Sequence, residues 1–361
     1  MLSLDTVRNA PKVLLHDHLD GGLRPATIID LAREYGYRGL PTEDEAALAT
    51  WFRRGADRKS LELYLETFVH TTGVMQHAGA MTRVTAECVE DLAADGVVYA
   101  EIRYAPELST AAGLTMDEVI EANLEGLRIG MVNAARTGRP IVARALVCGM
   151  RNGPNVLAAA QAALRHREDG VVGFDIAGPE AGFPPGEHRE AFELLRRACF
   201  RFTVHAGESA GPDSILDALA TCGAERLGHG VHLVDDIAAD AEGNPVLGRV
   251  AAYVRDRAIP VEVCPTSNVH TGFVASIADH PFDRLRRLGF RVTINTDNRL
   301  MSGVSASSET AALAEAFGYG LDDLEDFAVT ALDASFLAQP ERDWLVRELV
   351  RPGYERLRAN A

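Results

Sequence analysis

Short apolar runs rich in valine, isoleucine and phenylalanine recur along the chain, and a longer segment with helical periodicity follows each one. The runs predict eight strands, at residues 12–19, 97–105, 141–149, 171–178, 201–207, 225–230, 259–265 and 290–297. Nearly continuous hydrophobicity with β-branched residues is typical of parallel strands buried on both faces. Among the intervening helices, one at 25–35 starts with a proline suited to a first turn, and one at 115–136 opens with the capping-box pair Thr115 and Glu118.

Eight strand–helix units predict an α/β fold, a closed (β/α)8 TIM-type barrel, with residues 1–361 forming one domain. An open doubly wound sheet is the alternative, but no glycine-rich dinucleotide motif or P-loop follows any strand. Roughly 77 residues separate the first two predicted strands, too many for a simple crossover. We expect an elaborated insertion there, above the active-site mouth, and extra helices after residue 297.

Residue types that bind metals or transfer protons gather where the predicted strands end. These residues are His16, His18, His205, Glu208, His229 and Asp297. His16 and His18 are two residues apart, so in a strand they point to the same face. A lone histidine is usually a hydrogen-bonded core or surface residue, and an aspartate after a strand is commonly a turn or cap. The conjunction at matching strand ends favours a site, because barrel active sites form at the carboxyl ends of the strands.

Three imidazoles and one carboxylate suit Zn²⁺ and leave a position for water. Binuclear barrel hydrolases commonly bridge two ions with a carboxylated lysine at the end of strand four. The only lysines of this chain are Lys12 and Lys59, and neither lies in that strand. The sequence therefore predicts one Zn²⁺ per chain.

The residue types also predict a mechanism. A bound Zn²⁺ lowers the pKa of water to about 7 and so provides a nucleophile at neutral pH. Glu208, three residues beyond His205, is placed to donate a proton to a ring nitrogen of the substrate. His229 can orient the attacking oxygen and take part in its proton transfer, and Asp297 can bind both the metal and the same water.

Six motifs in this order resemble the adenosine deaminase family of the amidohydrolase superfamily. They are HDHLDGGLRP, VGFDIAGPE, TVHAGE, ERLGHG, VEVCPTS and INTDN, and they span residues 12–300. The resemblance implies zinc-dependent deamination of adenosine and 2′-deoxyadenosine to inosine and 2′-deoxyinosine, as in purine salvage.

The resemblance also implies a role for each matching residue. Zinc would be held by His16, His18, His205 and Asp297, with Glu208 as proton donor at purine N1 and His229 as the catalytic histidine. The substrate would be contacted by His18, by Asp20 at the ribose 5′-hydroxyl, by the Gly178 backbone N–H at purine N3, and by Asn298 near N7. Asn298 stands where well-known animal relatives have a second aspartate; its NH₂ group donates at every pH, whereas an aspartate must be protonated to donate.

Four apolar residues resemble the family's gate over the nucleoside: Leu61, Tyr64, Leu65 and Phe68. Their spacing of i, i+3, i+4 and i+7 is equally that of a helix packing one face on the core. Both interpretations stay open from the sequence.

The composition of the chain limits the classes of ligand and partner that it can bind. The formal net charge is −16, which disfavours nucleic acid and favours a small neutral or weakly basic ligand. No stretch approaches the length of a membrane span, and five widely spaced cysteines with no signal peptide predict a cytoplasmic protein. The sequence indicates no oligomeric state.

Three alternatives remain for the function. The first is deamination of another 6-aminopurine compound: adenine, a 5′-modified adenosine or 6-aminodeoxyfutalosine. The second is a metal-dependent C–O, C–N or P–O hydrolase on the same barrel, which the missing strand-four lysine and the position of Glu208 disfavour. The third is a non-catalytic binding protein, which the complete set of ligand types and the acid disfavour.

Overall fold

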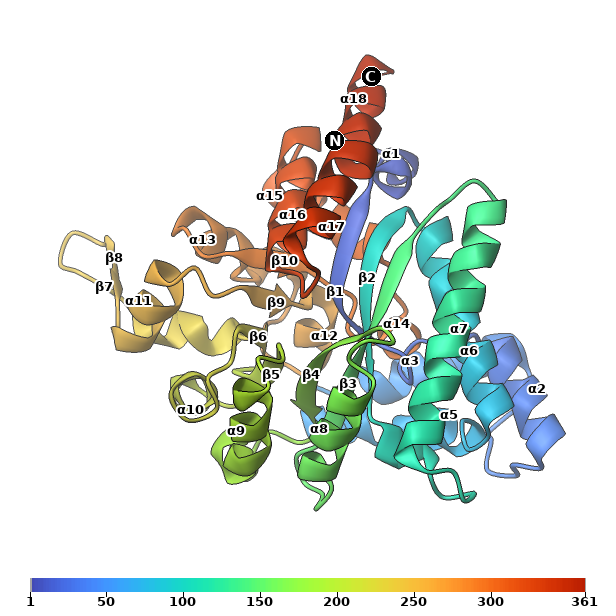
Figure 1. Ribbon diagram of the computed structural model, residues 1–361. Helices are drawn as coiled ribbons and strands as arrows, with labels where there is room; N and C mark the ends of the chain where they lie inside the picture. Colours follow the sequence, from blue (N-terminus) through green and yellow to red (C-terminus); the bar gives the residue numbers. More distant parts are fainter. Residues whose placement is uncertain (1, 361) are drawn as a thin grey trace.

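The computed structural model describes residues 2–360 and shows a closed parallel barrel (Figure 1). Four strands pair in the order β1-β2-β3-β4 and four in the order β10-β9-β6-β5, all in parallel. Bridges between Phe174 and Phe202 and between Asp17 and Asp297 join the two sheets at both seams. The predicted barrel is confirmed, and the open doubly wound sheet is wrong because β1 and β10 meet.

The eight barrel strands coincide with the eight apolar runs. They are β1 (Lys12–His18), β2 (Val97–Tyr104), β3 (Val142–Met150), β4 (Val171–Ala177), β5 (Thr203–Ala206), β6 (Arg226–His229), β9 (Val261–Val263) and β10 (Val292–Ile294). Most of their residues are buried, as strands between a filled barrel and a ring of helices require. The last two strands are shorter than the predicted runs, because residue 264 follows the end of β9, residue 265 begins a helix, and residues 295–297 belong to the turn that carries Asp297.

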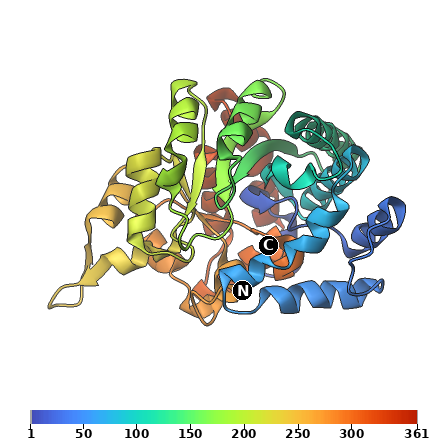
Figure 2. The same cartoon turned by 90° about the horizontal axis from the view of Figure 1, so that it is seen from below.

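Helices surround the strands (Figures 1 and 2). Those after β2 are α7 (Met116–Arg136), α8 (Val156–Arg165), α9 (Arg189–Arg197), α10 (Pro212–Asp217), α11 (Arg249–Asp256), α12 (Pro265–His270), α13 (Phe282–Arg287), α14 (Arg299–Ser302), α15 (Ala306–Phe317), α16 (Leu321–Ala334), α17 (Gln339–Leu345) and α18 (Arg351–Ala359). The capping box is present: the Thr115 hydroxyl accepts from the Glu118 N–H, and the Glu118 carboxylate accepts from the Thr115 N–H. The N-terminal α1 (Leu4–Asn9) packs against α15 and α18 at the end of the barrel that holds both termini.

Five helices occupy the long segment between β1 and β2. They are α2 (Pro25–Tyr35), α3 (Glu45–Ala56), α4 (Leu61–Leu65), α5 (Phe68–Val74) and α6 (Ala78–Ala94). Seen from the end opposite the termini, a blue helical stretch of this segment crosses in front of the barrel, whereas the dark-blue helix lies at its side (Figure 2). Residues of α4 and α5 line the cavity at the carboxyl ends of the strands, while α6 packs against α7.

One feature was not predicted. Residues 237–247 form a small antiparallel hairpin, β7 (Ile237–Ala239) and β8 (Pro245–Leu247), which projects from the barrel (Figure 1). Its strands have only three residues each, too few for a clear alternation of apolar and polar positions. Between residues 2 and 360, no helix is both long and apolar enough to cross a membrane.

Candidate active site

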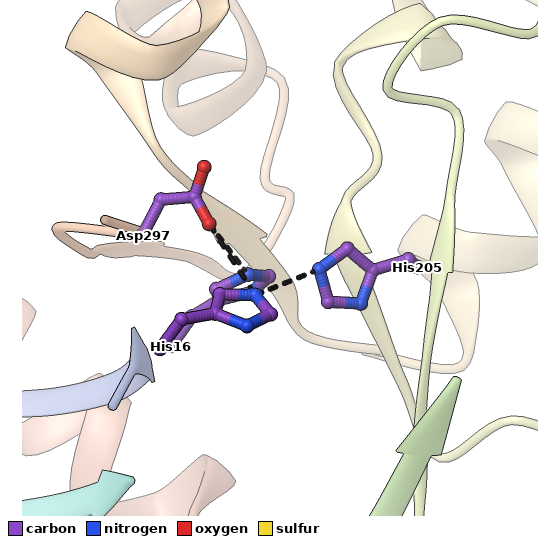
Figure 3. Close-up of side chains that lie close together, drawn as sticks. His16, His205 and Asp297 are labelled. Atoms are coloured by element: carbon purple, nitrogen blue, oxygen red, sulfur yellow. Dashed lines mark hydrogen bonds and ion pairs between the residues drawn. The ribbon is translucent and has the colours of Figure 1, made fainter. Parts of the chain in front are cut away.

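Four residues from three separate parts of the chain converge at the carboxyl end of the barrel (Figure 3). His16 and His18 come from β1, His205 from β5, and Asp297 from the turn after β10. Nε2 of His18 lies 3.2 Å from Nε2 of His205 and 3.4 Å from Oδ1 of Asp297, which is also 3.4 Å from Nε2 of His16. The structure thus brings together the four predicted ligands.

Two buried carboxylates contact the histidine rings of this cluster. Glu262 of β9 lies 2.9 Å from Nδ1 of His16, and Asp175 of β4 lies 2.8 Å from Nδ1 of His205. The guanidinium of Arg103 bridges the two carboxylates, donating from Nη1 to Asp175 and from Nη2 to Glu262. These contacts fix the orientation of both imidazole rings and place a ring proton on each Nδ1.

The chemistry of the donor set fits a metal ion. With their protons on Nδ1, His16 and His205 direct the lone pairs of Nε2 toward the oxygen of Asp297 and the ring of His18. Nε2 of His16 is buried without a hydrogen-bond partner among residues 2–360, and this arrangement suits a bound cation. An ion held at about 2.0–2.1 Å by a tetrahedral set separates its ligand atoms by about 3.3–3.4 Å, close to the distances found here. Burial also lowers the pKa of His18 and of His205, which keeps these rings in the neutral form that binds metals.

Glu208, which follows β5, and His229, at the end of β6, complete the site. Nε2 of His229 lies 3.7 Å from Oε1 of Glu208. Burial raises the pKa of Glu208 well above its usual value, and the charges of Asp297 and Glu180 add to the effect, so Glu208 is suited to hold a proton at neutral pH. His229 and Asp297 both adopt the left-handed backbone conformation, with φ of 60° and 55°. Such strain at non-glycine residues is common where a side chain must be aimed at a reacting group.

Comparison with known proteins identifies the family. The family model described as adenosine deaminase matches residues 11–352. The adenosine deaminase of Mycolicibacterium vanbaalenii is 57% identical over 98% of each chain, and adenosine deaminase 1 of Streptomyces coelicolor is 56% identical over 99% of this chain and 90% of its own. The chain belongs to the adenosine deaminase family.

A solved structure agrees in fold. An amidohydrolase from Burkholderia ambifaria, solved with bound Zn, superposes with a TM-score of 0.85 at 24% identity, covering 100% of this chain and 95% of that one. Identity this low supports the shared barrel alone. The two proteins therefore share the barrel.

The cavity beside the cluster has a volume of about 350 Å³, within the range of about 300–1,000 Å³ of small-molecule sites. It is lined by all the residues predicted to contact the substrate: His18, Asp20, Gly178 and Asn298. Burial, with help from the charges of Asp297 and Asp17, raises the pKa of Asp20 to about 7. Oδ1 of Asp20 and Oδ1 of Asn298 are buried without a hydrogen-bond partner among residues 2–360, so both are available to a ligand.

Two glycines of the family motifs make room for this arrangement. A Cβ at Gly21 would lie 1.9 Å from Oδ1 of Asn298, so the backbone approaches that side chain too closely for any other residue. Gly178 has a φ of 104°, a conformation that L-residues rarely adopt, and it turns the loop after β4 along the cavity. Both positions thus shape the wall of the pocket.

The four predicted gate residues all line the cavity. Leu61 and Tyr64 are buried, whereas Leu65 and Phe68 are half-buried. Tyr64 also lies within hydrogen-bond distance of Ser302, its hydroxyl being 3.1 Å from Oγ. The stripe therefore belongs partly to the core and partly to the mouth of the pocket, and neither interpretation from the sequence excludes the other.

Several residues that support the site were not predicted from the sequence. Glu180 accepts hydrogen bonds from the backbone N–H groups of residues 207–210 and so holds the loop that carries Glu208. Asp175 and Glu262 hold the histidine rings. All three lie inside the family motifs, and a carboxylate within an otherwise apolar strand, as in VGFDIAG and VEVC, is the signal that could have found two of them.

Proposed function

We propose that this protein hydrolyses adenosine and 2′-deoxyadenosine to inosine and 2′-deoxyinosine with release of ammonia. One Zn²⁺ per chain would be held by His16, His18, His205 and Asp297. The observation that carries the proposal is the position of Glu208, a buried acid that lines the same nucleoside-sized cavity as His18, His205 and Asp297 of the four-residue cluster. A family of adenosine deaminases that matches nearly the whole chain supports the choice of substrate.

When bound, Zn²⁺ supplies the acidity that makes a water molecule nucleophilic at neutral pH. The chain's own residues then bind and orient the purine and move protons. Glu208 holds a proton for purine N1, because burial keeps its carboxyl group neutral, and this donation relieves the charge that builds on the ring as C6 is attacked. His229, whose Nε2 lies 3.7 Å from Oε1 of Glu208, would orient the attacking oxygen. The largely apolar lining of the cavity, with Leu65 and Phe68 among its residues, limits the access of bulk water to the reaction.

The rest of the substrate would be placed by three contacts along the cavity. The N–H of Gly178 would donate to N3, Asn298 would donate from its NH₂ group to N7, and Asp20 would pair with the ribose 5′-hydroxyl. His18 would contact the substrate as well as the metal. These contacts reach both edges of the purine and the sugar, so they fix the position of C6 relative to the metal.

A panel of aminopurines followed by ultraviolet absorbance tests the proposal. We expect adenosine and 2′-deoxyadenosine to be turned over with the highest kcat/KM. A clear preference for adenine, for a 5′-modified adenosine or for 6-aminodeoxyfutalosine would overturn the adenosine assignment and leave zinc-dependent aminopurine hydrolysis standing.

Metal analysis of the active protein tests the stoichiometry. We expect one zinc per chain and loss of activity after removal with a strong chelator, restored by one equivalent of Zn²⁺. Two ions per active chain would contradict the mononuclear site. The five cysteines are all unpaired in the structure, which supports the cytoplasmic location that we also propose.

A further inference from the structure

Three buried side chains form a continuous hydrogen-bonded row behind the active site. They are His229 at the end of β6, Asn268 in α12 and His280 just before α13, with 1%, 0% and 3% of their surfaces exposed. Nδ2 of Asn268 lies 3.2 Å from Nδ1 of His229, and Oδ1 of Asn268 lies 3.2 Å from Nε2 of His280. The backbone N–H of Phe282 donates to Nδ1 of His280 over 3.1 Å.

The direction of every hydrogen bond in this row follows from its outer end. A backbone N–H can only donate, so Nδ1 of His280 is an acceptor and the ring proton of the neutral imidazole is on Nε2. That proton is donated to Asn268, whose Oδ1 must therefore face His280. The NH₂ group of Asn268 then faces His229, and Nδ1 of His229 must accept from it.

The opposite arrangement is excluded by the same reasoning. If the amide of Asn268 were turned over, its NH₂ group would meet the protonated Nε2 of His280, and two donors would face each other without an acceptor. A second proton on His280 would meet the N–H of Phe282 in the same way. Burial lowers the pKa of His280 to about 4, which agrees with a neutral ring.

We propose that His280 and Asn268 are positioning residues that fix His229 in the tautomer with its proton on Nε2, the nitrogen that faces the pocket. His229 then donates a hydrogen bond to the oxygen that attacks C6 and does not act as the base for it. In the reaction, the water oxygen bonds to C6 as the C6=N1 double bond opens and N1 takes the proton of Glu208. The proton that the water loses goes to the carboxylate of Asp297 instead of to Nε2 of His229. When the bond from C6 to the amino nitrogen breaks, that proton leaves with the amino group as ammonia, and the remaining hydroxyl proton returns to Glu208 as the C6 carbonyl forms. The consequence for rate depends on the proposed deamination, whereas the tautomer itself does not.

The tautomer also decides between two overlapping groups of potential metal ligands. Besides the four residues assigned above, His229 and Cys264 lie close enough to His16 and Asp297 to form a second group. A neutral His229 whose Nδ1 accepts from Asn268 and whose Nε2 carries a proton has no free lone pair for a metal. The row of hydrogen bonds therefore keeps His229 out of the ligand set and available to the substrate.

Nitrogen NMR of the zinc-loaded protein, labelled with ¹⁵N-histidine and measured without substrate, tests the proposal directly. The resonance of His229 is assigned as the one that disappears in His229→Gln. We expect a protonated Nε2 and an unprotonated Nδ1 in the parent protein. A parent His229 with its proton on Nδ1 overturns the proposal, whether or not the protein deaminates adenosine.

Variants of Asn268 and His280 then test whether these residues determine the tautomer of His229. Asn268→Asp replaces the donor with a carboxylate that accepts from Nδ1, so we expect the proton to move to Nδ1 and kcat to fall by about 100-fold, with zinc content unchanged. His280→Phe removes the group that orients Asn268; we expect a mixture of tautomers and a loss of about 3–10-fold in kcat.

Asn123→Asp is the matched control, because Asn123 is equally buried but lies between α6 and α7, where its Nδ2 donates to Thr85. We expect its His229 resonances to equal those of the parent. An unchanged tautomer in both Asn268→Asp and His280→Phe would overturn the assigned role of the row. If Asn268→Asp does not fold, the parent spectrum and His280→Phe decide the question.

Discussion

The floor and the lid of the pocket are built in opposite ways. The floor, formed by His16, His18, His205, Asp297 and the carboxylates beneath them, consists of buried polar groups at strand ends that are tied to one another. The lid, residues 61–74 of α4 and α5, faces the same cavity with apolar side chains that are partly exposed. A buried charge is stable only where its partners compensate for the hydration that it has lost, whereas an apolar contact tolerates small displacements.

This contrast assigns different tasks to the two regions. Preorganised polar groups stabilise the charge that develops in the reaction, so substitutions in the floor are expected to alter kcat and metal affinity. Apolar burial contributes equally to binding the substrate and the transition state, so substitutions in the lid are expected to alter KM.

The largest effect is expected at Glu208. Glu208→Gln keeps the shape of the side chain but removes the proton for N1, so we expect kcat to fall by about 10²–10⁴-fold while the zinc content stays at that of the parent. Steady-state kinetics with metal analysis measures both. Near-full turnover with zinc bound would remove Glu208 from the mechanism, and loss of zinc would show that it supports the metal instead.

The next effect concerns metal affinity. Asp175→Asn removes the charge that orients His205 and pairs with Arg103, so we expect zinc affinity to fall by about 10–100-fold in competition with a chelator. Asp236→Asn is the matched control, because the Asp236 carboxylate, like that of Asp175, accepts from backbone N–H groups, but it does so at the start of α11 and does not line the cavity. Equal zinc affinity in the parent and Asp175→Asn would show that this carboxylate has no influence on the metal.

A smaller effect is expected at Asp20, which is proposed to pair with the ribose 5′-hydroxyl. Asp20 has a pKa of about 7, so at pH 8 it is mostly ionised and accepts from the 5′-hydroxyl. Without that hydroxyl a buried charged acceptor is left unpaired, and we expect 5′-deoxyadenosine to have a kcat/KM at least about tenfold lower than adenosine. Asp20→Ala should remove most of this difference. A variant that discriminates as well as the parent would place the 5′-hydroxyl elsewhere.

The barrel and the positions of the chemical groups could be predicted from the sequence, because both depend on local signals. Apolar runs such as residues 171–178 identify strands, and a polar residue at the end of a strand faces the active-site end of a barrel. The supports could not be predicted in the same way. Tertiary contacts between separate segments bring Glu180 to the loop at 207–210 and Asn268 to His280. The spacing of these residues along the chain does not predict such contacts or the direction of their hydrogen bonds.

The short hairpin at residues 237–247 and the exact ends of β9 and β10 were missed for a different reason. A strand of three residues has too few positions to establish a period, so the pattern does not locate its ends. The lid illustrates a third limit. A helical stripe such as Leu61 to Phe68 has the same spacing whether it faces the core or a ligand, and only the structure shows that it faces both.

The smallest effect is expected at the lid, and it tests the contrast most directly. Leu65 is half-buried at the mouth of the cavity and makes no polar contact there. Complete burial of a leucine side chain contributes about 1.5–3 kcal/mol, so the part that a bound nucleoside covers contributes about 1 kcal/mol. Leu65→Ala should therefore raise KM for adenosine by about fivefold and leave kcat within twofold of the parent. Leu4→Ala makes the same change in α1, at the opposite end of the barrel, and should alter neither constant. A fall in kcat without a change in KM would show that the lid takes part in the chemical step, and the division between floor and lid would then be wrong.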